Sequence, residues 1–327
     1  MKGTLPDRID VKTAAARIEG GVRRTPTLVL DRADTGIDAR VVLKLELTQH
    51  SGSFKARGAL NSVLSLQPGV DGVCAASGGN HAGAVSWAAQ RAGLTADVFV
   101  PANATPAKIA RIAEYGGRAH LVGGFVKDAL EACQEFARHH DVPLLHPYDT
   151  FETVCGAGTT GLEIADQVPD VGLVLVGCGG GGLYAGLAAA LEPHVRVQPV
   201  EPVACPDLAN AISAGRPVDT TVGGVAVDSL GAPRIGEIAY ATAVDHAVAP
   251  VLVEEEAILD ARSFLWSRAR VLAEPGACVA LASLLTGVVA VAAEQTVVVV
   301  VSGGNNDSVP ATPIRALSRG EGSGLPR

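Results

Sequence analysis

Apolar residues in this chain gather into short runs that alternate with longer segments of helical length. Runs of about five residues rich in valine and leucine, such as 41–45 and 296–301, have the length and β-branched content of buried strands. The segments between such runs, for example 81–92 and 183–191, are long enough to form helices. Short apolar strands that alternate with helices predict a mostly parallel sheet covered on both faces, and therefore an α/β fold.

The remaining elements follow from the same pattern. We expect strands at 41–45, 73–76, 96–100, 120–122, 144–146, 172–177, 195–200 and 296–301. We expect helices at 53–66, 81–92, 106–115, 125–140, 156–168, 183–191 and 208–215, the first of them capped by Ser53. The most apolar window, 279–301, contains Glu294, Gln295 and Thr296, so it predicts a buried helix, a turn and a buried strand, not a membrane span.

Composition narrows the class of protein. The chain has 327 residues, 48% of them hydrophobic, which suits one large or two medium domains with a substantial core. The net charge is −8 and the basic residues are scattered, so we expect no nucleic-acid partner. The six cysteines form no CxxC pair, and residues 1–10 lack an apolar signal region, so we expect a cytoplasmic protein with no membrane partner. Residues 316–327 have the composition of a flexible tail.

One loop is built almost entirely from glycine. The sequence "VLVGCGGGGLYAG" at 174–186 is typical of a strand, a glycine turn and a helix, where crowded backbone N–H groups bind an anion such as phosphate. Gly177, Gly179 and Gly182 also fit G-x-G-x-x-G, and Glu201 follows on the next strand, as in dinucleotide-binding proteins. A nicotinamide dehydrogenase and an enzyme with a cofactor monophosphate therefore both remain open. No G-x-x-x-x-G-K-[ST] motif is present, which excludes P-loop chemistry.

Two further loops of small residues follow predicted strands. Ser77, Asn80 and His81 lie in "SGGNH" at the start of a helix, where donors bind a carboxylate well, and Asn80 can also donate to a phenolic oxygen. The alternative is that Asn80 and His81 only cap the helix. The loop at 302–305 repeats this arrangement after the last strand. Loops at the carboxyl ends of parallel strands converge on one crevice.

A lysine beside an aromatic residue adds a candidate for covalent chemistry. Lys55 follows Phe54 in "SGSFKARG", and a lysine buried beside a ring loses its preference for the charged state and becomes nucleophilic. An aldehyde cofactor that carries a phosphate needs such a lysine, an anion-binding loop and donors to its ring. Pyridoxal phosphate meets that description, whereas hydride transfer needs no buried lysine.

The motifs together resemble a known family. "GSFKARGA", "SGGNH", "GGGGL", "VEP" and "SGGNND" resemble, in order, the threonine/serine dehydratase and serine racemase family of fold type II pyridoxal-phosphate enzymes, over 24–307. The resemblance implies two open, mostly parallel sheets covered by helices, with the cofactor in the interdomain cleft. It implies a large domain from 1–71 and 150–327, an inserted small domain at 72–149, and a homodimer.

The resemblance also implies residue roles. Lys55 would hold the cofactor as a Schiff base and then take the substrate α-proton, while Phe54 lies against the cofactor ring. Asn80 would donate to the ring 3-oxygen and Ser302 would face the pyridine nitrogen. The phosphate would be held by the backbone of Gly179, Gly180, Gly181 and Gly182. The substrate carboxylate would be bound by Ser77, Asn80 and the backbone near His81.

A divalent-cation site is implied as well. Glu201, Cys205 through its carbonyl, and Asp207 match the spacing of the family's site, and oxygen ligands of this kind suit Mg²⁺ or Ca²⁺. Glu201 is otherwise an ordinary residue at the end of a strand.

One departure bears on the reaction. Racemases of the family commonly carry a serine two residues before the asparagine, as the base on the opposite face of the substrate, and Gly78 stands there. The expected activity is therefore elimination of water from L-threonine, L-serine or a related β-hydroxy amino acid. Alternatives are an amino-acid racemase, a β-replacement enzyme and, less favoured, a nicotinamide dehydrogenase.

Overall fold

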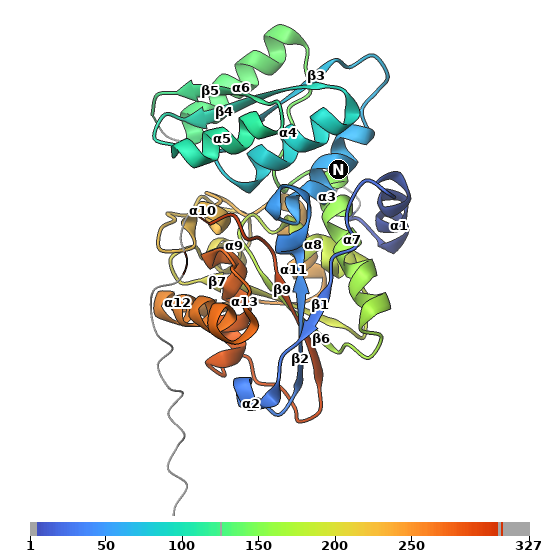
Figure 1. The fold of residues 1–327 in the computed structure, drawn as a ribbon, viewed down its shortest axis with the longest axis vertical. Helices are drawn as coiled ribbons and strands as arrows, with labels where there is room; N and C mark the ends of the chain where they lie inside the picture. Colours follow the sequence, from blue (N-terminus) through green and yellow to red (C-terminus); the bar gives the residue numbers. More distant parts are fainter. Residues whose placement is uncertain (1–4, 125, 307–308, 310–327) are drawn as a thin grey trace, which may run out of the picture.

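The computed structural model describes residues 5–124, 126–306 and 309, and within them the strands form two separate sheets. Six strands form one sheet in the order β1-β2-β9-β6-β7-β8, and three form the other in the order β3-β4-β5. The two sheets lie in different lobes of the molecule (Figure 1). Only β1 runs antiparallel to its neighbour, so both sheets are mostly parallel, as the sequence predicts. The expected tail at 316–327 lies outside the described residues.

Seven of the eight expected strands are present, whereas the strands at Thr27–Val29 and Val251–Val253 were not predicted. The six-stranded sheet contains β1 (Thr27–Val29), β2 (Arg40–Leu45), β6 (Leu173–Gly177), β7 (Arg196–Pro202), β8 (Val251–Val253) and β9 (Thr296–Val301). The three-stranded sheet contains β3 (Gly72–Ala76), β4 (Thr95–Pro101) and β5 (Arg118–Val122). The run at 144–146 is not a strand, because only an isolated bridge joins Leu144 to Cys74.

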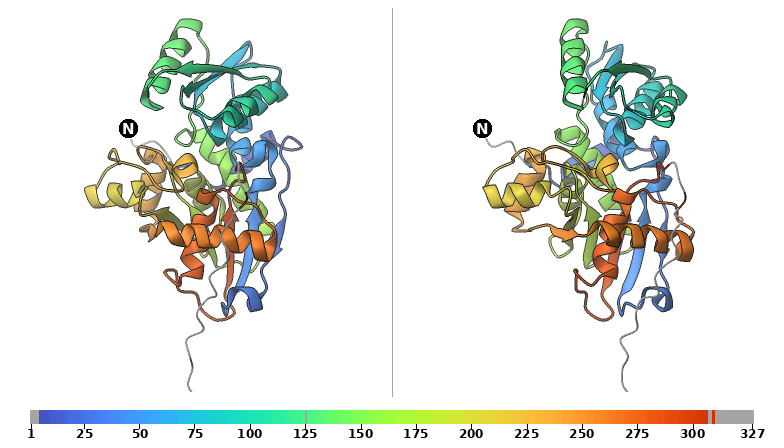
Figure 2. Two further views of the ribbon diagram at one scale, coloured as in Figure 1. Left: turned by 60° about the vertical axis from the view of Figure 1, so that its left-hand side comes forward. Right: turned by 90° about the vertical axis from the view of Figure 1, so that its left-hand side faces the viewer.

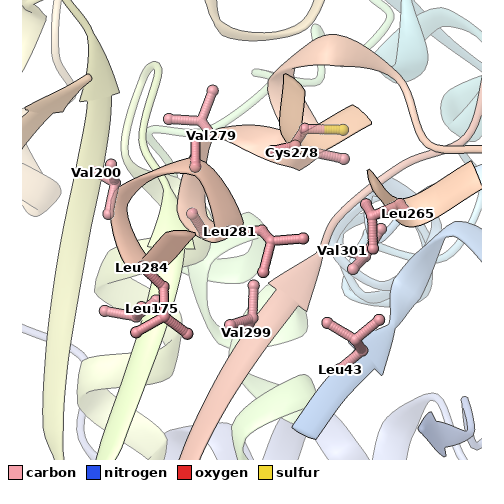
Figure 3. Close-up of a cluster of buried hydrophobic side chains, with 14 of the residues drawn as sticks. Leu43, Leu175, Val200, Leu265, Cys278, Val279, Leu281, Leu284, Val299 and Val301 are labelled. Atoms are coloured by element: carbon pink, nitrogen blue, oxygen red, sulfur yellow. The ribbon is translucent and has the colours of Figure 1, made fainter. Parts of the chain in front are cut away.

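Helices cover both faces of the larger sheet. One face packs on α12 (Glu255–Phe264) and α13 (Pro275–Leu285), and the other packs on α7 (Phe151–Gln167), α8 (Gly182–Ala190), α9 (Asp207–Ala214) and α11 (Glu237–Asp245). Val299 and Val301 lie in the first core, which Figure 3 shows, whereas Val298 and Val300 lie in the second. A central strand buried on both faces explains the unbroken valine run in the sequence.

The smaller sheet is covered in the same way, by α4 (Asn80–Ala92) and α5 (Pro106–Glu114) on one side and by α6 (Val126–His140) on the other (Figure 2). We propose that residues 72–149 form a small unit and that the remainder of the chain forms a large unit. Among the described residues, no helix has the length and apolar character that a membrane crossing requires.

The helix α3 (Lys55–Leu64) lies where the two lobes meet (Figure 1). Its apolar side, with Ala59 and Leu60, packs in one core with residues of β3 and α4. Its opposite side contacts α7, where Gly58 meets the Thr153 backbone so closely that a Cβ would lie 2.8 Å from the Thr153 carbonyl oxygen. The expected Ser53 cap is wrong, because the helix begins at Lys55 and Ser53 is extended and bridges to Gly303.

The remaining helices are short or peripheral. They are α1 (Arg8–Arg17), α2 (Arg32–Thr35) and α10 (Val227–Leu230), with single turns at Glu46–Thr48 and His50–Gly52 and a π-helical turn at Leu265–Ala269. The turn at His50–Gly52 matters for the site, because it directs the chain from β2 into α3.

Candidate active site

The segment that leads into α3 is paired with the loop that follows β9. Phe54 N donates to the Ser302 carbonyl at 3.0 Å, and Gly304 N donates to the Gly52 carbonyl at 3.0 Å. A bridge between Ser53 and Gly303 lies between these two bonds. The pairing brings Phe54, the residue before Lys55, against Ser302, although the two segments are far apart in the sequence.

Lys55 is half-buried among two aromatic rings and a main-chain carbonyl. Its Nζ donates to the Pro147 carbonyl at 2.6 Å and lies 5.0 Å from the centre of the Phe54 ring and 6.0 Å from that of Tyr148. Burial lowers the pKa of Lys55 to about 8, although the charge of Glu274 acts in the opposite direction. A lysine with this pKa is partly neutral near physiological pH, which is what a nucleophilic or basic lysine requires.

The side chain of Asn80, at the start of α4, makes polar contacts with other segments and does not cap the helix. Gly79 is the N-cap of α4, and no side chain caps this helix, so the capping hypothesis for Asn80 and His81 is wrong. The Asn80 side chain contacts Glu274 and Asn305 of the large unit. Ser77 Oγ accepts from Gly79 N at 3.2 Å.

His81 is buried and contacts the backbone of the small unit. Its Nε2 lies 2.9 Å from the Leu145 carbonyl oxygen, and burial, reinforced by the charge of Lys55, lowers the pKa of His81 to about 3. A neutral imidazole therefore donates to this carbonyl. It places the start of α4 against the segment that carries Pro147, the partner of Lys55.

The four-glycine loop makes close approaches that side chains would block. A Cβ on Gly180 would lie 2.3 Å from the Tyr148 ring, and one on Gly182 would lie 2.6 Å from the Tyr148 carbonyl oxygen. Gly181, at φ +82°, is the N-cap of α8, which has no side-chain cap. Loop and helix start therefore offer backbone N–H groups beside the Tyr148 ring, which also faces Lys55.

Glu274 and Asn305 make side-chain contacts that the sequence did not predict, and Tyr148 makes further contacts in this region. Burial raises the pKa of Glu274 to about 7, and the hydrogen bond from Asn80 opposes this shift. Burial also raises the pKa of Tyr148 to about 12, and its hydroxyl donates to the Arg234 carbonyl at 3.0 Å. The sequence did contain a signal that Glu274 could have a special role. Glu274 is an acidic residue within the apolar sequence "VLAEPGACVA", where a charged side chain is rare.

Glu201, Cys205 and Asp207 lie together at the carboxyl end of β7. The Glu201 carboxylate accepts from Leu208 N at 2.6 Å and from Ala209 N at 3.0 Å, so it holds the start of α9. Both carboxylate oxygens of Asp207 are buried and make no hydrogen bond of good geometry in the described structure, although the Thr220 hydroxyl lies close enough to oppose the rise in the pKa of Asp207. Burial raises the pKa of Glu201 to about 8 and that of Asp207 to about 7.

The side chains of Glu201 and Asp207 supply oxygen ligands of the kind that a divalent cation needs. The part of the chain that the structure describes contains no group of three or more His, Cys, Asp or Glu side chains placed to hold a metal. The buried oxygens of Asp207 and the adjacent Glu201 nevertheless suit a hard cation, because oxygen ligands, main-chain carbonyls included, are what Mg²⁺ and Ca²⁺ prefer.

The fold and the lysine site together define a class of protein. A model of the family described as pyridoxal-phosphate dependent enzyme matches residues 18–303, and the chain belongs to that family. The crystal structure of a T.th. threonine deaminase superposes with a TM-score of 0.87 at 35% identity, covering 93% of this chain and 100% of that one. The fold type II architecture expected from the motifs is therefore confirmed.

Relatives within the family carry two kinds of name. An L-threonine ammonia-lyase from Geobacter sulfurreducens is 35% identical over 281 residues, which are 84% of this chain and 70% of the relative. A serine racemase from Oryza sativa subsp. indica is 31% identical over 293 residues, which are 87% of this chain and 85% of the relative. The chain is thus a member of the threonine dehydratase and serine racemase group, and the resemblance inferred from its motifs is confirmed.

Proposed function

We propose that this protein is a pyridoxal-phosphate-dependent ammonia-lyase that eliminates water from L-threonine, L-serine or a related β-hydroxy amino acid. The observation that carries the proposal is the position of Lys55, whose amine is partly buried between Phe54 and Tyr148 and has a pKa of about 8. The products would be a 2-oxo acid and ammonia.

The residues present suit the cofactor. Lys55 would bind it covalently, and the N–H groups of the four-glycine loop at the start of α8 would hold its phosphate. Phe54 would lie against the ring, Asn80 would donate to the ring oxygen, and Ser302 would face the ring nitrogen. When bound, pyridoxal phosphate supplies an electron sink for the bond electrons that remain on the substrate Cα.

The chain's own groups then account for binding and proton transfer. Ser77, Asn80 and the backbone near His81 would orient the substrate carboxylate at the start of α4, where N–H groups point outward. Lys55 would take the α-proton, because its lowered pKa makes a neutral amine available at Nζ. Serine at 302 is a weak partner for the ring nitrogen compared with aspartate, which suits elimination over transamination.

Gly78 favours a lyase over a racemase. Racemisation needs a second proton carrier on the opposite face of the substrate, and Gly78 has no side chain to act as one. The lyase and the racemase relatives are similar to this chain to nearly the same degree, so this local difference supports the choice. A β-replacement enzyme is the other alternative, and Ala56 stands after the lysine where such enzymes more often carry aspartate.

The direct test is to incubate the purified protein, loaded with pyridoxal phosphate, with L-threonine, L-serine, phenylserine and 3-hydroxyaspartate. We expect a visible absorbance band that borohydride bleaches, and release of a 2-oxo acid and ammonia in equal amounts from one or more of these substrates. Formation of D-amino acid without ammonia would support the racemase. Reduction of a nicotinamide cofactor, with no such band, would support a dehydrogenase.

We also propose that Glu201, Asp207 and the Cys205 carbonyl bind Mg²⁺ or Ca²⁺. Two adjacent buried carboxylates with raised pKa values are costly without a cation, and a bound cation removes this cost. We expect Ca²⁺ or Mg²⁺ to raise the unfolding temperature of the wild type and not that of Asp207→Asn. Equal shifts in both proteins would exclude the site.

A cytoplasmic location and a homodimer complete the proposal. The six free cysteines are all buried, as suits a reducing compartment, and sedimentation at several protein concentrations would test the dimer. A single species of monomer mass at all concentrations would contradict it.

A further inference from the structure

A chain of side-chain hydrogen bonds connects four segments around Asn80. Asn305 Nδ2 donates to the Ser51 carbonyl at 2.9 Å and to Asn80 Oδ1 at 2.6 Å. Asn80 Nδ2 in turn donates to Glu274 Oε1 at 2.7 Å. The chain therefore runs from the turn before Lys55, through Asn305 and Asn80, to Glu274.

The groups at the two ends determine the direction of these bonds. The Ser51 carbonyl only accepts, so it must face an amide N–H, and the Glu274 carboxylate does the same whenever it is ionised. Asn305 consequently uses its two N–H groups on Ser51 and Asn80. Rotating the Asn80 amide by half a turn would place its oxygen against the Glu274 carboxylate and its nitrogen against the Asn305 nitrogen, and both contacts would be repulsive.

Close backbone approaches hold the same groups in place. A Cβ on Gly52 would lie 2.3 Å from Asn305 Oδ1, and a Cβ on Gly303 would lie 2.3 Å from Glu274 Oε1. Glu274 N also donates to the Gly303 carbonyl at 3.1 Å. Ser51 has a φ of +56°, a conformation that a residue with a side chain adopts only under constraint, and its carbonyl is the end of the chain of bonds.

The chain of bonds also joins the two units. Asn80 is the first residue of α4 in the small unit, whereas Glu274 precedes α13 and Asn305 follows β9 in the large unit. Asn80 Nδ2 has two N–H groups, and the bond to Glu274 uses one of them. The orientation of the second N–H is therefore set by two residues of the other unit.

We propose that Glu274 and Asn305 are positioning residues, which dock the small unit through Asn80 and fix its amide so that the second N–H faces the ring oxygen of the bound cofactor. This inference rests on the proposed function only in assigning Asn80 to the cofactor. Neither Glu274 nor Asn305 needs to touch the substrate for this role.

The test uses the cofactor-loaded protein and four variants. Asn305→Ala removes both donors without adding charge, and Asn305→Asp keeps the shape but offers acceptors where donors are needed. Glu274→Gln keeps the shape but removes the preference for one amide orientation. Asn61→Asp is the matched control, because Asn61 is a buried asparagine of α3 that bonds to Arg17 and the Glu152 carbonyl, outside the chain of bonds.

The readouts are the visible band of the bound cofactor, its pH titration, and kcat and KM. We expect both Asn305 variants to shift the band and to lower kcat on the order of 10- to 100-fold, the effect of one or two lost hydrogen bonds. Glu274→Gln should act in the same direction. Asn61→Asp should lower the unfolding temperature and leave the band unchanged.

A second comparison asks whether the two residues act through Asn80. In an Asn80→Ala background, Asn305→Ala should produce no further shift of the band, because the amide it orients is gone. A wild-type band in Asn305→Ala and Glu274→Gln, or an undiminished further shift in the Asn80→Ala background, would overturn the inference. A wild type that shows the band but releases no 2-oxo acid would overturn only the lyase, and the spectral test would still apply.

Discussion

The ammonium nitrogen of Lys55 donates to the main-chain carbonyl of Pro147, 2.6 Å away across the junction between α3 and the segment before α7. This bond leaves Lys55 without a carboxylate partner at hydrogen-bonding distance among the described residues, so burial dominates and its pKa falls to about 8. The same bond places the amine beside the Tyr148 ring that rests on the four-glycine loop.

The first prediction concerns the pH dependence of cofactor loading. Only the neutral amine attacks an aldehyde, and a pKa of about 8 means that the neutral fraction of Lys55 grows from about a tenth at pH 7 to about nine tenths at pH 9. The rate at which the cofactor-free protein gains its visible band should therefore rise by roughly tenfold over this range. Stopped-flow absorbance measures the rate, and a flat profile from pH 7 to 9 would contradict the prediction.

The second prediction concerns Lys55 itself. Lys55→Ala should lose the covalent bond to the cofactor. Its elimination rate should fall by about 10²–10⁴-fold or more, because this is the range for the loss of one general base. Ammonia release and the mass of borohydride-reduced protein measure the two losses. Lys127→Ala is the control, because Lys127 is exposed on the surface of α6 and pairs there with Glu131. Ammonia release from Lys55→Ala at the wild-type rate would refute the assignment.

The third prediction concerns Gly78 and reaction specificity. A Cβ at Gly78 would meet Pro101, Val100 and Ala104 at 3.9–4.0 Å, which are ordinary contacts, so a side chain fits there. Gly78→Ser should gain racemisation of L-serine, on the order of 10²-fold above the wild type, because it adds a proton carrier on the second face.

Gly78→Ala is the control that separates the effect of the serine hydroxyl from the effect of the added Cβ. Alanine has the same Cβ as serine but no hydroxyl proton to transfer. Chiral chromatography of the remaining serine measures racemisation. Equal D-serine formation in the Ser and Ala variants would show that the hydroxyl does not act as the second base.

The fourth prediction concerns a buried ion-pair network around Arg57, which lies two residues after Lys55 in α3. Arg57 donates through Nε and Nη2 to Glu46, both at 2.8 Å, and through Nη1 to Glu163 at 2.7 Å. Burial would lower the pKa of Arg57, but the two carboxylates raise it, so the guanidinium stays charged. Lys44 donates to Glu163 as well.

Arg57→Met should lower the free energy of unfolding by about 3–5 kcal/mol, because it leaves Glu46 buried without its partner. Urea denaturation measures this loss. Arg138→Met, at an exposed position of α6, is the control and should change stability by less than about 0.5 kcal/mol. If Arg57→Met also lowered the free energy of unfolding by less than about 0.5 kcal/mol, the ion-pair network would add little to the anchoring of α3.

Much of the fold could be predicted from the sequence because its information is local. The valine run at 296–301 is apolar at every position after Thr296, and only a strand buried on both faces satisfies that pattern. The same reasoning failed at Ser53 and at 144–146, where the pairing of distant segments decided the conformation. Ser53 is drawn into a bridge with Gly303, and Leu144 pairs only once with Cys74.

The sequence by itself determined the α/β class and the family, and it marked Lys55 as the candidate for covalent chemistry, because motif spacing and periodicity are properties of neighbouring residues. The tertiary structure decided what surrounds that lysine. Pro147, Glu274 and Asn305 reach Lys55 or Asn80 from other elements, and no local pattern encodes the distance between segments so far apart. The burial that lowers the pKa of Lys55 and the hydrogen bonds that orient the Asn80 amide exist only once those segments are packed together.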